Sequence, residues 1–183
     1  TLSTESIFVA DWGTRNIQKF DKETYAHQDT FGIYISNYDE ETFTVPYGVY
    51  VDDDYIYVPT GNEVKMYRRD DESYDGIFGC VSSSDTCYES PTAVWGDDTY
   101  IYIGEGGGSD SIKKFHKDNH SFLDNQTLTG GQPPYQIWGD STSLYLAVPS
   151  SNQAIKMRKS DLAITHTFGD GVGGCTSSRT HSP

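Results

Sequence analysis

The sequence predicts an all-β fold built from about four repeats of four short antiparallel strands, and three observations lead to this prediction. Pro46, Pro91 and Pro134 open segments with the same pattern of letters, 45 and 43 residues apart. The 14 Tyr, 8 Phe and 3 Trp suit half-buried pleated surfaces, and the 18 Gly suit tight turns between strands. Self-similarity at this period, with several strands per unit, is typical of the blades of a β-propeller.

The chain is expected to form a single propeller domain, 1–183, because no shift in composition divides it. The repeat units run approximately over 1–45, 46–90, 91–133 and 134–182. The first unit lacks the segment that starts with proline, and Pro183 lies where a fifth unit would start. We therefore expect a ring that is incomplete in this chain or is closed by another segment or chain.

Each complete unit divides into four strand-like runs, which in the second unit are 47–52, 55–58, 63–67 and 74–78. An Asp-rich link at 52–54 favours a hairpin turn over a calcium loop, since Asp side chains bond to nearby backbone and no EF-hand spacing is present. The second run is apolar throughout, as in Ile56 and Val58, which predicts a strand covered on both faces. The third run carries lysines, which we expect to face solvent near the outer rim. The fourth run ends in Phe-Gly in three of the four units, giving a packing anchor and a residue free to turn.

The segment 7–32, IFVADWGTRNIQKFDKETYAHQDTFG, followed by VPYGVYVDDDYIYV, resembles the NHL-repeat pattern of Pro-x-Gly-Val, Asn-x-Ile-x-x-Phe and a closing Phe-Gly. The resemblance extends over nearly the whole chain. It implies four-stranded blades, usually in a ring of six, and function through interaction surfaces far more often than through catalysis. The chain departs from the family at Tyr50, Trp95 and Trp138, where a small residue is usual; we interpret these as larger core side chains between blades rather than ligand-stacking groups.

The charge balance of 27 acidic against 13 basic side chains gives a net charge of −14, which opposes binding to nucleic acid and to anionic membranes. No apolar run is long enough for membrane insertion. Cys80 and Cys87 bracket a short loop that permits a disulfide, with two free buried thiols as the alternative. The sequons at Asn119 and Asn125 add a prediction of glycosylation, and together these features favour an extracellular or secreted location.

We predict no catalytic, cofactor-binding or zinc residues. The expected innermost strands carry no histidine, and the five histidines are scattered over other runs. No nucleophile elbow or phosphate-binding loop is present. Structural calcium is the one cofactor that the Asp-rich turns leave open.

The missing innermost strand is the most informative feature for function. Without it the edge strand Ile7, Phe8, Val9, Ala10 and Asp11 would be unpaired, and such edges promote association. We therefore expect a non-enzymatic extracellular propeller that binds protein or glycan and self-associates into a ring or filament.

Candidate binding loops lie around Tyr47, Tyr88, Tyr135 and the cysteine loop. The alternative is a fragment of a larger propeller enzyme, a lyase or hydrolase, whose catalytic blades lie outside these residues. A third hypothesis is a glycosylated structural protein of a filament or surface coat.

Overall fold

The computed structural model describes residues 6–32, 43–79, 88–108, 110–128 and 133–169. They form four antiparallel sheets, numbered here 1 to 4 along the chain. Sheet 1 contains β1 (Ser6–Asp11), β2 (Asn16–Asp21) and β3 (His27–Phe31); sheet 2 contains β4 (Tyr50–Val51), β5 (Tyr55–Thr60), β6 (Glu63–Arg68) and β7 (Tyr74–Ile77); sheet 3 contains β8 (Pro91–Gly96), β9 (Tyr100–Glu105), β10 (Ser111–His116) and β11 (Phe122–Thr127); sheet 4 contains β12 (Gln136–Gly139), β13 (Ser143–Val148), β14 (Gln153–Arg158) and β15 (Ile164–Phe168), with a short 3-10 helix at Pro149–Ser151.

Each sheet is a meander in which every strand pairs with the strand next to it in sequence. Sheets 2, 3 and 4 have four strands, and sheet 1 has three within the described residues. Register fixes the repeat: β9 pairs with β10 through Tyr102 and Lys114, and β13 pairs with β14 through Tyr145 and Lys156. The prediction of an all-β fold with four-stranded units is confirmed.

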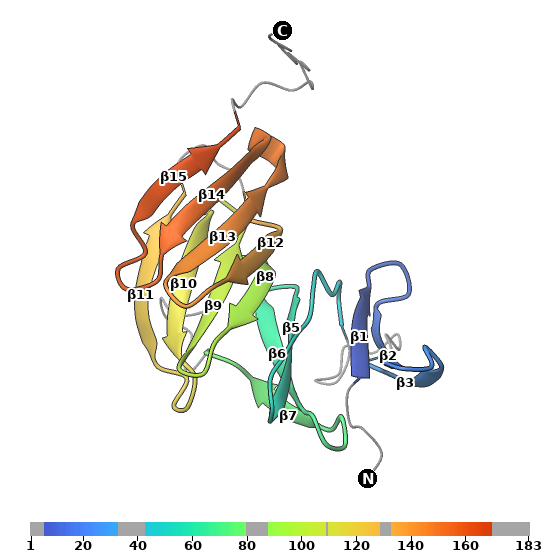
Figure 1. Ribbon diagram of the computed structural model, residues 1–183. Coiled ribbons are helices and arrows are strands. Elements are labelled where there is room, and N and C mark those ends of the chain that lie inside the picture. The colour runs from blue at the N-terminus through green and yellow to red at the C-terminus, as the bar shows by residue number, and fades with distance from the viewer. Residues whose placement is uncertain (1–5, 33–42, 80–87, 109, 129–132, 170–183) are drawn as a thin grey trace, which may run out of the picture.

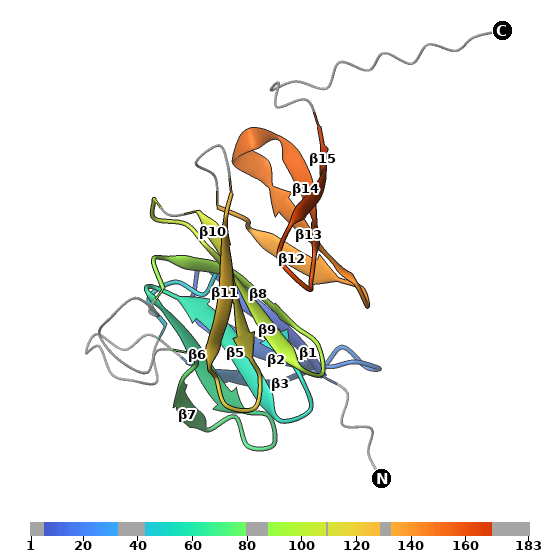
Figure 2. The ribbon, with the colours of Figure 1, turned by 90° about the vertical axis from the view of Figure 1, so that its left-hand side faces the viewer.

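The four sheets follow one another face to face in chain order, with sheets 1 and 4 at opposite ends of the array in Figure 1 and with sheet 1 behind sheets 2 and 3 in Figure 2. Three apolar clusters hold it together, one between each pair of successive sheets. Each central sheet thus contributes side chains from both faces. The second strands of these sheets show the consequence, since Ile56, Val58, Ile101 and Ile103 are fully buried.

Three lysines of the third strands lie in these interfaces, so the prediction that they face solvent is wrong for these three. Lys65, Lys113 and Lys114 are each less than 10 % exposed. Their stems cover apolar surface while their ammonium groups reach polar or aromatic partners. Lys113 pairs with Glu105 at 3.0 Å, and the Lys114 ammonium lies 4.0 Å from the centre of the Tyr100 ring.

The turns follow the chemistry expected from the sequence. The Oδ1 atom of Asp52 accepts backbone N–H bonds from Asp54 and Tyr55 at 2.9 and 2.8 Å, which closes the β4–β5 hairpin. At the ends of the fourth runs, Gly32 and Gly79 have φ values of 69° and 71°, a region that favours glycine. A Cβ on Gly79 would also lie 2.3 Å from the Tyr88 hydroxyl, so this corner tolerates no side chain.

The first strand of sheet 2 is shorter than predicted. Pairing is limited to Tyr50–Val51 and an isolated bridge between Pro46 and Thr60, whereas the sequence pattern predicted a strand over 47–52. Among the described residues, no helix has the length and apolarity required to span a membrane.

Candidate functional site

Each sheet has two faces, which we name by what they contact. The front face packs against the following sheet along the chain, and the back face packs against the preceding sheet. In sheet 3 the front face carries Trp95, Tyr102 and Lys114, which are cross-strand partners. Its back face carries Ile101, Ile103 and Phe115, which join the cluster shared with sheet 2.

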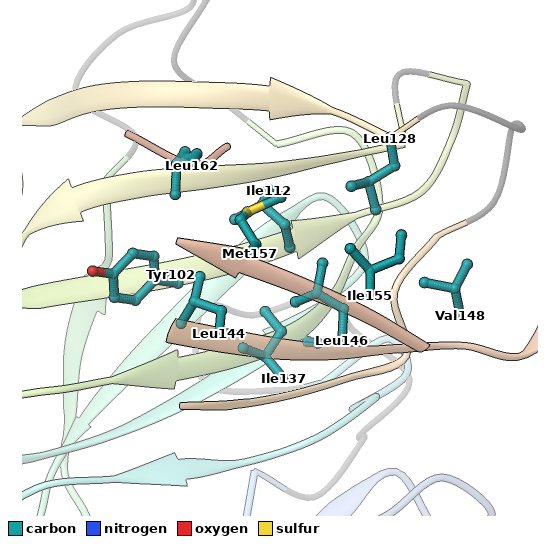
Figure 3. Packing of buried hydrophobic residues seen from close by; sticks show 11 residues of the cluster. Tyr102, Ile112, Leu128, Ile137, Leu144, Leu146, Val148, Ile155, Met157 and Leu162 are labelled. Atoms are coloured by element: carbon teal, nitrogen blue, oxygen red, sulfur yellow. The ribbon is translucent and has the colours of Figure 1, made fainter. Parts of the chain in front are cut away.

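The interface between sheets 3 and 4 shows what covers a front face. Tyr102 and Ile112 of sheet 3 meet Leu144, Leu146 and Met157 from the back face of sheet 4 (Figure 3). All five are at most 1 % exposed. Burial of this apolar area is the main contribution to cohesion between successive blades.

An aromatic residue of each complete front face packs on a glycine of the next sheet. A Cβ on Gly139 would lie 2.5 Å from the Trp95 ring, and a Cβ on Gly96 would lie 2.8 Å from the Tyr50 ring. The Tyr50 hydroxyl also donates to the Gly96 carbonyl at 2.9 Å. Burial is the main cause that raises the pKa of Tyr50 to about 12, with nearby aspartates adding to it. The interpretation of Tyr50 and Trp95 as core residues between blades fits these contacts.

A repeated ion pair crosses the same two interfaces. Lys117, which follows β10, pairs with Asp52 of the preceding sheet at 2.9 Å. Lys159, which follows β14, pairs with Asp97 of the preceding sheet and lies 5.0 Å from the centre of the Trp95 ring. In sheets 3 and 4 the lysine that follows the third strand therefore binds the aspartate that follows the first strand of the preceding sheet.

The front face of sheet 4 carries the same kinds of residue as that of sheet 3 but is not covered by another sheet within the described residues. Trp138, Tyr145 and Lys156 are cross-strand partners, with the Trp138 and Tyr145 rings 5.5 Å apart. Trp138 is 61 % exposed and Phe168 is 51 % exposed, and His166 stacks on Phe168. Together Trp138, Tyr145, Lys156, His166 and Phe168 define the end face of sheet 4.

The back face of sheet 1 is the opposite end of the array. Ile7 and Val9 are 38 % and 43 % exposed, whereas their counterparts Ile101 and Ile103 are fully buried. Phe20 pairs with Ile7 on this face. These three residues define the end face of sheet 1, and they occupy the positions that cover a front face in each interior interface.

A hollow opens beside the interface of sheets 3 and 4, at the end of the blades where the ion pair lies. It has a volume of about 720 Å³ and is lined by Asp97, Tyr100, Lys114 and Lys159 among others. A smaller hollow of about 330 Å³ lies at the same end between sheets 1 and 2, lined by Lys22, Asp52 and Arg69 among others. Polar groups are thus gathered at one end of the blades, next to the inter-blade ion pairs.

The Asp140 carboxylate accepts the same kinds of hydrogen bond as that of Asp52, which forms an ion pair between blades. Its Oδ1 atom accepts the backbone N–H groups of Thr142 and Ser143, both at 2.8 Å, and its Oδ2 atom accepts the Tyr145 hydroxyl at 3.0 Å. These bonds, those from the backbone first, lower the pKa of Asp140 to about 2. Asp52 accepts the Tyr57 hydroxyl at the same 3.0 Å distance. Asp140 is thus a preformed anionic acceptor at the edge of the sheet 4 end face.

The candidate loop tyrosines differ in accessibility. Tyr135 is 43 % exposed and precedes β12, beside the end face of sheet 4, and Tyr47 is half-buried. Tyr88 is 3 % exposed and donates its hydroxyl to the Phe78 carbonyl at 2.9 Å. Burial between sheets 2 and 3 therefore removes its side chain from the candidate surface contacts.

The other predicted sites are placed as follows. Asn119 lies in the β10–β11 turn and Asn125 on β11, and both are exposed. Within the described ranges β1, with Ile7, Phe8, Val9, Ala10 and Asp11, pairs only with β2 and forms the edge of sheet 1. Cys80, Cys87 and Cys175 lie outside the described residues. The part of the chain that the structure describes holds no group of three or more His, Cys, Asp or Glu side chains arranged to bind a metal ion.

Sequence reasoning placed Trp138 in the core and so missed the end face of sheet 4. The letters Trp-Gly-Asp occur at 95–97 and again at 138–140, so local sequence gives no difference. Among the described residues no sheet lies in front of sheet 4, and the letters around Trp138 carry no signal of that difference.

No family model matches this chain, and no curated protein matches it. Solved structures do. The chain resembles "Structure of U3-55K" with a TM-score of 0.68 and 10 % identity, over 89 % of this chain and 48 % of that one. It resembles "Crystal structure of RRP9 WD40 repeats" with a TM-score of 0.66 and 10 % identity, over 89 % and 47 %. The fold is that of a β-propeller.

A chain from "Crystal structure of Nidogen/Laminin Complex" matches with a TM-score of 0.66 and 14 % identity, over 90 % of this chain and 59 % of that one. The chain spans about half the length of the first two matched structures. At these identities the likeness establishes the fold and leaves the NHL-repeat resemblance as a prediction. The propeller fold is consistent with a protein-interaction module.

Proposed function

We propose that this chain is a non-enzymatic, extracellular propeller module with NHL-like repeats that binds a protein partner through the end face of sheet 4. The observation that carries the proposal is the exposure of Trp138 in a row of side chains that is buried in sheet 3. Tryptophan and tyrosine are enriched at the centres of protein interfaces, since they combine large apolar area with a polar group. Monomeric proteins rarely leave such a cluster uncovered without an interaction role.

Two of the similar structures are the WD40 repeats of RRP9 and a complex of nidogen with laminin. They support a protein partner here by analogy of fold alone.

The extracellular part of the proposal is supported by the exposed sequon residues. Asn119 and Asn125 present their side chains to solvent on the outer hairpin of sheet 3, away from the end face of sheet 4. Glycans there would leave that face free. Intact mass before and after enzymatic deglycosylation tests this part; an unmodified chain from its native source would contradict it.

The binding part is tested with matched variants. Immobilised wild-type chain, Trp138→Ala and Trp12→Ala are compared for retention of proteins secreted by the source organism. Trp12 is a suitable control because it is 65 % exposed but lies in the β1–β2 turn, outside either end face. We then expect a purified partner to lose affinity at least about 30-fold with Trp138→Ala and to bind Trp12→Ala as it binds wild type.

The same set of variants separates the alternative ligand class. If Trp138→Ala weakens binding to a glycan array and no protein is found whose binding depends on Trp138, the ligand of this face is a glycan and not a protein. Binding of either class that is unchanged by Trp138→Ala would overturn the assignment of this face.

A further inference from the structure

We infer that the hollow beside the interface of sheets 3 and 4 binds a small organic acid that carries one carboxylate and several hydroxyl groups, as a sugar acid does. None of the residues that line this hollow belongs to the end face of sheet 4, so the inference goes beyond the proposed function. Its basis is a buried lysine without a carboxylate partner beside a buried tyrosine hydroxyl without a hydrogen-bond partner, at a hollow of about 720 Å³.

Lys114 is the cation that the hollow offers to a ligand. Its side chain is buried, and its ammonium donates to the Lys159 carbonyl at 2.9 Å and lies 4.0 Å from the centre of the Tyr100 ring. No carboxylate of the described residues pairs with it. A buried ammonium group is unfavourable unless a negative charge compensates it. One ring and one carbonyl supply only part of that compensation, and an anion in the hollow would complete it.

The same position of sheet 2 shows that packing between blades does not require this charge. Met66 pairs with Tyr57 in sheet 2 as Lys114 pairs with Tyr102 in sheet 3. Met66 is 4 % exposed and belongs to the apolar cluster between sheets 2 and 3. An apolar side chain therefore fills this position in one interface, and the lysine in the other interface is free to serve a ligand.

The Tyr102 hydroxyl departs from the repeat in the same interface. Its counterparts Tyr57 and Tyr145 each donate, at 3.0 Å, to the aspartate that follows the first strand of their own sheet. Tyr102 lines the hollow, but its hydroxyl is buried without a hydrogen-bond partner. Figure 3 shows this hydroxyl directed away from the aliphatic side chains of the cluster. Burial first, and then Asp97, raises the pKa of Tyr102, so the hydroxyl keeps its proton and remains a donor.

Two flexible lysine side chains lie next to this hydroxyl. The ammonium groups of Lys114 and Lys159 are 6.0 and 5.9 Å from the centre of the Tyr102 ring. A lysine stem has several rotatable bonds, so a carboxylate in the hollow could draw the Lys114 ammonium towards itself. That movement would open space for a second ligand oxygen to accept the Tyr102 hydroxyl.

The other charged groups of the hollow favour a ligand with a single negative charge. Lys159 is paired with Asp97, and Arg158 is paired with Asp161 at 2.7 Å. Asp98 also lines the hollow and is exposed. Lys114 is therefore the one lining cation that lacks a carboxylate partner within the described ranges, and a second negative charge on the ligand would be repelled by Asp98.

Hydroxyl groups around the hollow suit a ligand that carries hydroxyl groups itself. Thr99, Ser141 and Ser160 line the hollow and are exposed. Together with the Asp98 carboxylate they supply both donors and acceptors. The volume of the hollow lies in the range of ordinary small-molecule sites. A hydroxy acid would use the lysine and these groups at once, whereas a simple carboxylate would use the lysine alone.

Calorimetric titration of the full chain with D-glucuronate tests the site. We expect saturable binding to wild type and a loss of at least about tenfold in affinity with Lys114→Met, which removes a hydrogen bond to a charged group. Sheet 2 already has methionine at this position, so the variant should fold, and circular dichroism checks it. Lys19→Met is the matched control, because it makes the same change at the equivalent position of sheet 1, outside the hollow. It should bind D-glucuronate as wild type does.

Tyr102→Phe gives a readout that a purely structural role would not give. Its hydroxyl has no partner in the free chain, so the thermal unfolding midpoint should stay unchanged or rise. The affinity for D-glucuronate should fall about threefold to tenfold, since a hydrogen bond to the ligand is lost. A lower midpoint with unchanged affinity would overturn the role of Tyr102.

Three further probes separate the parts of the ligand. Acetate carries the carboxylate alone, D-glucose carries the hydroxyl groups alone, and inorganic phosphate carries more negative charge. Each should bind at least about tenfold more weakly than D-glucuronate. Equal binding of any of the three would overturn the assignment of a hydroxy acid. An oligosaccharide that ends in glucuronate distinguishes the source: tighter binding than that of the free acid would assign the site to a glycan, and weaker binding would assign it to the free acid.

Two results would overturn the site itself. One is the lack of saturable D-glucuronate binding up to about 10 mM, and the other is binding that Lys114→Met leaves unchanged. Either result would leave protein binding through Trp138 untouched, because Trp138 does not line the hollow.

Discussion

The same three residues, Trp-Gly-Asp, occur at 95–97 in sheet 3 and at 138–140 in sheet 4 with opposite surroundings. Trp95 packs on Gly139 beneath the Lys159 ammonium, and Asp97 binds that ammonium. Trp138 is 61 % exposed, and no ion pair to the Asp140 carboxylate occurs within the described ranges. The difference shows that the same residues take part in a contact between blades in sheet 3 and stay exposed in sheet 4, which no other sheet covers within the described residues.

The largest difference in the free energy of unfolding is expected for the tyrosines at equivalent positions on the front faces of sheets 3 and 4. Tyr102→Ala removes a fully buried ring and should lower the free energy of unfolding by about 3–5 kcal/mol. Tyr145→Ala, at the same position of sheet 4, should cost less than about 1.5 kcal/mol because its ring is only partly covered. Urea unfolding followed by circular dichroism measures both, and equal losses would show that the two faces are equally buried.

The two back faces give the second comparison. Ile101→Ala should cost about 2–4 kcal/mol, because it leaves a cavity in the contact between sheets 2 and 3. Ile7→Ala should cost less than about 1 kcal/mol in a chain kept dilute, where the sheet 1 end face contacts solvent. Finding a large loss for Ile7→Ala under those conditions would contradict the open end.

The third comparison concerns Gly139, the glycine on which the Trp95 ring packs. Gly139→Ala should lower the unfolding free energy by about 1–3 kcal/mol, since the added Cβ would lie 2.5 Å from the ring. Gly48→Ala is the control, because nothing lies within 4 Å of its added Cβ. Thermal unfolding measures both variants, and similar midpoints would argue against tight packing of Trp95.

Asp140 gives a prediction in acid. Its pKa is lowered to about 2 in the folded chain from a usual value near 3.8, so its contribution to stability is present above pH 3.8 and is lost as the pH falls towards 2. Asp140→Asn should therefore flatten the loss of stability between pH 4 and pH 2. Urea titrations at these two values check it, and a parallel acid limb in the variant would contradict the hydrogen-bonded carboxylate.

The smallest expected effect concerns the hydrogen bond between sheets 2 and 3. Tyr50→Phe should cost about 1 kcal/mol at neutral pH through loss of the bond to the Gly96 carbonyl. The raised pKa of Tyr50, about 12, means that its stabilisation is present below pH 10 and is lost as the pH rises through 12. The variant should thus lose stability less steeply above pH 10, which unfolding at several alkaline pH values would measure.

The repeat in the sequence was sufficient to predict the hairpin turns, most of the strands and the three strands that sheet 1 has within the described residues, although β4 is shorter than predicted. The alternation of apolar residues and turn residues such as Asp52 act locally, so the sequence alone predicts the strands and turns that they form. The burial of Lys113 and Lys114 could not be predicted in this way, because a charged residue is expected to be exposed unless the sheet that packs against it is known. Burial of these lysines depends on Glu105 and on the rings of neighbouring tyrosines.

The candidate site was only partly predictable for a related reason. The open edge of β1 followed from counting copies, since the first unit lacks one strand. The exposure of Trp138 required knowing which sheet lies in front of it, and identical letters at 95–97 predicted burial. Tyr88 was predicted to belong to a surface binding loop, but its side chain is buried. A loop residue next to a strand can still point into the contact between two blades.

Hydroxyl-radical footprinting of the three tryptophans measures directly whether the end face of sheet 4 is uncovered. Trp95 should stay protected at every protein concentration, and Trp12 should stay reactive. Trp138 should be reactive in the isolated chain and become protected when the chain is bound to its partner. A Trp138 that is as protected as Trp95 in the isolated chain, or as reactive as Trp12 in the bound chain, would contradict an uncovered contact face on sheet 4.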